Sequence, residues 1–137
     1  MSLVVSGAFS ETIPKQSAVA CGTTLSSDAG IDVVFLTTEG EAVASVDLAI
    51  DDVMKDETGS GFPATLRVRH TDQRSWTVSD CAAEVLAHAY QEADEMFDYH
   101  RISGTLACGS PAESNSGMDA ELAIESFAFV CTVPWTR

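Results

Sequence analysis

Apolar side chains recur at every second position along much of the chain, a period typical of β-strands with one buried face. Residues 101–109 and 125–135 show this pattern most clearly. Each run carries one cysteine in its apolar phase, Cys108 in the first and Cys131 in the second. We interpret these two runs as central strands of an all-β domain.

The same alternation predicts further strands, over residues 3–13, 17–25, 31–38, 41–51, 65–70 and from 76 onward. Glu39 and Gly40 predict a tight hairpin turn. A one-residue slip in the apolar phase of the last strand predicts a β-bulge at Glu125 and Ser126. Together these elements predict one antiparallel β-sandwich of seven to nine strands that spans residues 1–137.

Residues 80–99 fit two structures. Apolar residues recur at every fourth position, as in a helix, at Val85, Ala89, Ala93 and Phe97. Read with a period of two, the odd-numbered positions are apolar instead, and His88 falls on the polar side with Glu84. A helix would leave the strand before it without a hairpin neighbour. We therefore predict a strand to about residue 90 and a loop or one short helical turn near 91–98.

The charge of the chain excludes some classes of partner. The sequence has 21 acidic and 7 basic side chains, a formal net charge of −14 at pH 7. Such a surface repels phosphate backbones and anionic lipid headgroups, so we expect no nucleic-acid partner and no membrane binding through basic patches. No run approaches the roughly 18 apolar residues of a membrane-spanning segment. Cationic partners and metal ions are compatible with this charge.

The chain has four cysteines, at positions 21, 81, 108 and 131. Their spacing, with no Cys-x-x-Cys pair, excludes the usual zinc motifs. We predict two disulfide bonds, which indicate an oxidising, extracytoplasmic compartment. The preferred pairing is Cys81 with Cys108 and Cys21 with Cys131, one of the three that four cysteines allow. The alternative is four reduced thiols in the core of a cytosolic protein.

Three histidines suggest catalysis, but no Gly-x-Ser-x-Gly, His-Glu-x-x-His or paired-cysteine motif accompanies them. We therefore assign no catalytic residue and no cofactor. The candidate metal ligands are His88, Glu92 and His100, because a helix would place His88 and Glu92 one turn apart. Residues 52–63 are predicted to form an acidic loop. The acids of this region lack the order of an EF-hand and are interpreted as solvated: Asp51, Asp52, Asp56 and Glu57.

The runs YHRISGT at residues 99–105 and SFAFVC at residues 126–131 resemble the C-terminal half of small lipid-anchored envelope lipoproteins of the mycobacterial antigen type. The resemblance implies an exported β-sandwich of non-enzymatic or unassigned role, tethered outside the membrane. The chain begins without the lipobox cysteine of such proteins. We interpret residues 1–3, Met-Ser-Leu, as a start derived from cloning, which is compatible with removal of a native leader.

These observations predict an exported module, either periplasmic, secreted or envelope-anchored, that binds a protein, peptide or glycan. The alternative is a small metal-binding protein or hydrolase that uses His88, His100 and nearby carboxylates. A third interpretation is a homo-oligomer in which an exposed edge strand pairs with a second copy. We favour a binding role over an enzymatic one.

Overall fold

The computed structural model describes residues 1–14, 19–23, 30–37 and 42–136, without the side chains of residues 19–23 and 136. Its strands are β1 (Ser2–Gly7), β2 (Glu11–Ile13), β3 (Val19–Thr23), β4 (Ile31–Thr37), β5 (Val43–Ile50), β6 (Gly59–His70), β7 (Ser75–Ala93), β8 (Phe97–Cys108), β9 (Glu113–Ser114) and β10 (Leu122–Thr136). No helix occurs in these parts of the chain, and accordingly none of them forms a helix that could span a membrane.

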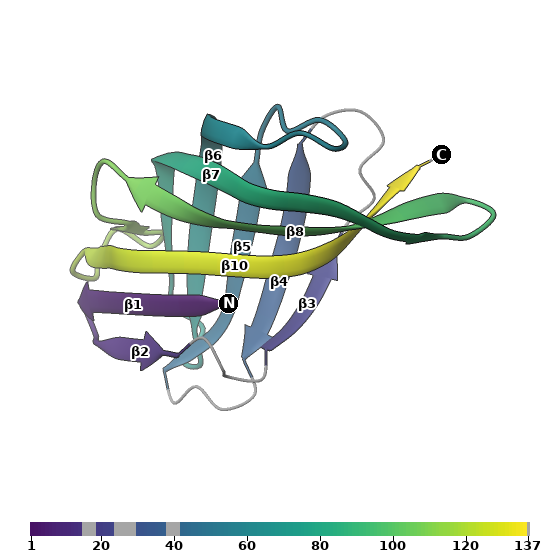
Figure 1. Cartoon of the computed structure of the whole chain (residues 1–137). Helices are drawn as coiled ribbons and strands as arrows, with labels where there is room; N and C mark the ends of the chain where they lie inside the picture. The colour runs from purple at the N-terminus through teal and green to yellow at the C-terminus, as the bar shows by residue number, and fades with distance from the viewer. Residues whose placement is uncertain (15–18, 24–29, 38–41, 137) are drawn as a thin grey trace.

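Nine strands form one continuous antiparallel sheet in the order β2-β1-β10-β8-β7-β6-β5-β4-β3, and β9 pairs with β7 beside this path. The sheet curls strongly into an open half-barrel (Figure 1). Phe35 of β4 and Phe127 of β10 meet across its interior, with ring centroids 6.1 Å apart. The all-β antiparallel prediction is confirmed. The predicted two-layer sandwich is corrected to a single sheet, which covers its own apolar face by curling.

The predicted bulge in the last strand is confirmed. Val4 pairs with Ser126 and Val5 with Ile124, which leaves Glu125 as the additional residue of β10. The predicted strand over residues 3–13 is divided in two, because Gly7 adopts a φ of +109° and ends β1. A side chain at Gly7 would place its Cβ 2.5 Å from the backbone oxygen of Glu121, which directly precedes β10. β2 then folds back and pairs with β1.

Residues 75–108 form the longest hairpin of the structure, β7–β8, whose tip projects beyond the rest of the sheet (Figure 1). The predicted short helical turn near 91–98 is wrong. The Asp94 side chain accepts hydrogen bonds from the backbone N–H groups of Met96 and Phe97, at 2.8 and 2.7 Å, and so makes a tight turn between the strands. β6 begins at Gly59, so the predicted loop over 52–63 is also shorter than expected.

The predicted disulfide between Cys81 and Cys108 is confirmed, since the two residues lie directly opposite each other on β7 and β8 and are bonded. The other predicted bond, Cys21–Cys131, includes a side chain outside those that the structure describes. The predicted turn at Glu39 and Gly40 also lies outside the described residues. The strands on either side of it, β4 and β5, do pair in antiparallel fashion.

Candidate metal centre

A β-bulge in β7 turns His88 toward the concave side of the sheet. The pairing of β7 with β8 shifts register between Val85 and Ala87, and the added residue reverses the phase of the strand beyond it. Gly104 of β8 makes room for the bulge, because a Cβ there would lie 2.1 Å from the carbonyl oxygen of Glu84. The predicted placement of His88 on the polar side is therefore wrong.

His100 projects from β8 to the same side. It is opposite Tyr90 in the register of β7 and β8 and is 1% exposed. The ring centroids of His88 and His100 are 4.9 Å apart. The structure thus brings together the two histidines of the predicted metal set.

The loop between β5 and β6, residues 51–58, supplies the third member of the cluster. Asp56 has a φ of +67°, a left-handed conformation that aspartate adopts more readily than most residues. The loop is anchored by Val53, which is fully buried. Beside Asp56, Lys55 forms an ion pair with Asp98 of β8. These contacts anchor the loop beside the part of the hairpin that carries His88 and His100.

The geometry of the cluster suits a metal ion. One potential ligand atom from each of Asp56, His88 and His100 lies within 4.8 Å of the other two. Asp56 Oδ1 is 3.2 Å from His100 Nδ1. His88 Nδ1 lies 2.9 Å from the carbonyl oxygen of Glu57, and His88 Nε2 accepts a hydrogen bond from the Asp56 N–H at 3.2 Å. Nδ1 therefore carries the proton, and the lone pair of Nε2 accepts the Asp56 N–H.

The buried polar atoms of the cluster lack hydrogen bonds. Among the side chains that the structure describes, both ring nitrogens of His100 and Nε1 of Trp135 are buried without a hydrogen-bond partner. The contact of His100 with Asp56 is close but lacks hydrogen-bond geometry. Trp135 packs on His88 with centroids 5.2 Å apart and on His100 at 5.7 Å. Because an unpartnered buried group costs about 1–3 kcal/mol, these atoms indicate a binding site.

Burial lowers the pKa of His100 below its ordinary value of 6.5. His88 and Lys55 act in the same direction, whereas the carboxylates of Asp56 and Asp98 oppose the shift. His100 is therefore a neutral imidazole at neutral pH, the form that binds metal ions.

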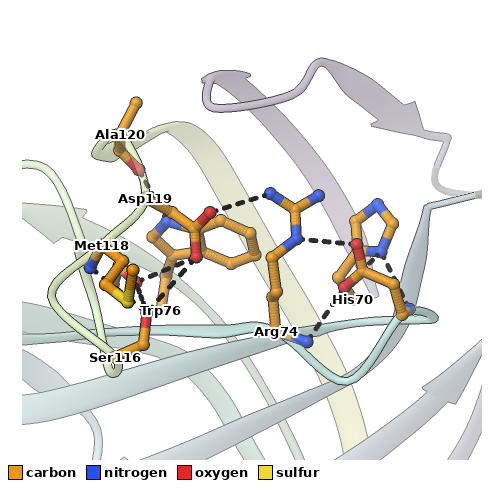
Figure 2. A network of polar contacts seen from close by, with 9 residues as sticks. His70, Arg74, Trp76, Ser116, Met118, Asp119 and Ala120 are labelled. Carbon is orange, nitrogen blue, oxygen red and sulfur yellow. Dashed lines mark hydrogen bonds and ion pairs between the residues drawn. The ribbon is translucent and has the colours of Figure 1, made fainter.

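The third histidine belongs to a different cluster, which has its hydrogen bonds in place (Figure 2). His70 Nδ1 accepts a hydrogen bond from the backbone N–H of Asp72 at 3.0 Å. Arg74 donates to the Asp72 carboxylate at 2.7 Å and lies over the ring of Trp76, 5.2 Å from its centroid. Hydrogen bonds from the backbone and side chain of Arg74 hold the pKa of Asp72 below its usual range.

The same cluster fastens the loop before β10. Arg74 also pairs with Asp119 at 3.3 Å, and Trp76 Nε1 donates to the carbonyl oxygen of Ala120 at 2.8 Å. Figure 2 shows these contacts joining the β6–β7 hairpin to the loop. Since its charges are already paired, we interpret the cluster around Arg74 as a structural one.

Glu92, the third predicted ligand, does not join His88 and His100. It is exposed near the tip of the hairpin, where it pairs with Tyr99. Its selection assumed a helix, whereas residues four apart on a strand are separated by about 13 Å. The carboxylate in the cluster is that of Asp56, which sequence reasoning assigned to solvent. Asp56 and His88 are 32 positions apart, and no local pattern marks them as neighbours.

No protein-family model, curated protein or solved structure matches the chain. Its function is therefore argued from this geometry.

Proposed function

We propose that the protein binds a divalent transition-metal ion through Asp56, His88 and His100. The observation that carries the proposal is His100, which is 1% exposed, has neither ring nitrogen in a hydrogen bond, and lies 3.2 Å from the carboxylate of Asp56. Two atoms bound to one tetrahedral zinc ion at about 2.0–2.1 Å lie roughly 3.3 Å apart, close to this separation.

The donor set favours zinc and its neighbours over calcium or magnesium. Two imidazoles and one carboxylate suit zinc, copper, nickel and iron, whereas the hard cations prefer oxygen ligands. The hydrogen bond between His88 Nδ1 and the carbonyl oxygen of Glu57 supports His88 as a ligand. Such an outer bond orients the ring and raises the basicity of the other nitrogen.

Metal uptake requires a small rearrangement of the loop. The lone pair on His88 Nε2 accepts the Asp56 N–H, and one lone pair serves one partner. A metal ion must therefore displace this N–H while the Asp56 side chain moves toward the histidines. The side chain of Asp56 is 67% exposed, so the carboxylate has room to move.

The Cys81–Cys108 disulfide supports an extracytoplasmic location as part of the proposal. Binding of a protein, peptide or glycan stays a prediction. So does pairing of an edge strand with a second copy, for which the sheet edges are β2 and β3.

Calorimetric titration of the metal-free protein with ZnCl₂ tests the proposal. We expect one ion per chain, an affinity that falls at least about tenfold in Asp56→Asn, and no comparable change in Glu92→Gln, the matched acid outside the cluster. In NMR spectra, zinc should shift the imidazole signals of His88 and His100 and the Asp56 amide but leave His70 unchanged. No zinc binding, or an equal response of all three histidines, would overturn the proposal.

A further inference from the structure

The ring of Trp135 packs against the proposed metal centre and carries a second kind of buried polar atom, its indole N–H. The residue is 2% exposed, and its indole N–H has no hydrogen-bond partner. Its ring contacts both histidines, with centroids 5.2 Å from His88 and 5.7 Å from His100. A metal ion leaves this donor unsatisfied, because a cation accepts no hydrogen bond. The indole N–H therefore requires an acceptor other than the ion.

The coordination of the ion supplies a position for that acceptor. Asp56, His88 and His100 provide three ligands, and a tetrahedral ion keeps at least one further position open. Two neutral imidazoles and one carboxylate leave a divalent ion with a net charge of +1. The neighbouring Lys55 and Asp98 neutralise each other in their ion pair. An anionic ligand is thus favoured at the open position.

We propose that the bound metal ion carries an exchangeable small oxyanion, of the carboxylate or phosphate class, that accepts the Trp135 N–H. This inference rests on the proposed metal binding. The net charge of −14 opposes anions, but charges farther away than about 8 Å are largely screened at physiological ionic strength. The metal ion and the indole N–H therefore decide the affinity. The exposed side of the centre at Asp56 gives the anion access from solvent.

The experiment uses the Co²⁺-loaded protein, with acetate and inorganic phosphate as probes. We expect each anion to change the visible absorption spectrum of Co²⁺ and to saturate at one per chain. The sequence has two tryptophans, and Trp76 is an internal control because its N–H is already bonded to Ala120. In the Zn²⁺-loaded, ¹⁵N-labelled protein, the anion should move the Trp135 indole N–H signal downfield and leave that of Trp76 in place.

Trp135→Phe removes the donor but keeps an aromatic ring on His88. We expect it to weaken anion binding roughly tenfold or more, as for a hydrogen bond to a charged group, measured on protein saturated with Co²⁺. If this variant does not fold, the two indole signals of the unaltered protein decide. A chain that takes up no Co²⁺ refutes the metal site itself. A chain that takes up Co²⁺ but shows no anion-dependent spectrum, or no selective shift of Trp135, refutes the oxyanion alone.

Discussion

His70 and His100 each lie beside an aspartate and a tryptophan, but the two clusters are completed differently. Around His70, the Arg74 guanidinium pairs with Asp72 and covers the ring of Trp76, so a cation is already part of the cluster. Around His100, Lys55 is paired with Asp98, and the imidazole has no hydrogen bond. The same residue types thus form a hydrogen-bonded structural cluster around His70, whereas the imidazole of His100 is buried without a hydrogen bond.

The comparison shows which feature points to a ligand. Acidic side chains are common in a chain of this charge, and the His70 cluster combines an aspartate with a histidine without any need for a metal ion. What distinguishes the His100 cluster is burial combined with missing partners, since a buried polar group is almost always hydrogen-bonded in a folded protein. Buried polar atoms without hydrogen-bond partners are therefore a better guide to a binding site than the mere presence of histidines and acids.

Substitution of His70 and of His100, one at a time, should give the largest difference in affinity for Zn²⁺. We expect His100→Gln to lower the affinity for Zn²⁺ at least about 100-fold, because loss of a ligand exceeds the 10–100-fold typical of outer-shell partners. His70→Gln should change it less than about threefold. Calorimetric titration measures both, with circular dichroism to show that each variant is folded. Equal affinities in the two variants would remove the distinction between the clusters.

The two tryptophans should differ in the metal-free protein. Trp76→Phe and Trp135→Phe remove the same volume from buried sites, but only Trp76 loses a hydrogen bond, the one to Ala120. Trp135→Phe removes a donor that had no partner. We expect Trp76→Phe to reduce the free energy of unfolding by about 1–3 kcal/mol more than Trp135→Phe. Urea unfolding monitored by far-ultraviolet circular dichroism checks this, and equal losses would show that the Trp135 N–H is satisfied.

Some of this organisation could be predicted from the sequence because it depends on neighbours along the chain. Alternation places Ile102 and Leu106 in the core, and the phase slip near Glu125 marks a bulge that the pairing confirms. The bond between Cys81 and Cys108 fits the alternation, which turns both side chains toward the apolar side of two strands that pair in the sheet. The curl of the sheet could not be predicted, because twist and bulges accumulate over many strands.

The geometry of the candidate site could not be predicted either, because it also depends on contacts between residues far apart in the sequence. The bulge that turns His88 inward depends on Gly104 of the facing strand, and a glycine in a strand has several explanations. Asp56 reaches the histidines through a loop that Val53 and Lys55 anchor, and neither contact has a local signature. Helical spacing predicts Glu92 as a ligand, but the segment that carries it forms a strand. Sequence reasoning therefore found the two histidines but not their geometry or their carboxylate.

The acid response of the metal-free protein should show the smallest of these effects, and it concerns His100 alone. Burial lowers the pKa of folded His100, while the unfolded chain keeps a value near 6.5. Between these two pKa values the unfolded chain binds more protons, so the free energy of unfolding decreases as the pH falls through about 6.5. Above this window both states are neutral at His100, and the residue makes no pH-dependent contribution.

Relative to the unaltered protein, His100→Gln should flatten this dependence by up to one proton. Urea unfolding of chelator-treated protein between about pH 5 and pH 7.5 measures both slopes. An unchanged slope of unfolding free energy against pH in His100→Gln would mean that the buried imidazole gains its proton as readily in the folded protein as in water. The surroundings of His100 would then not be the desolvated ones on which metal binding depends.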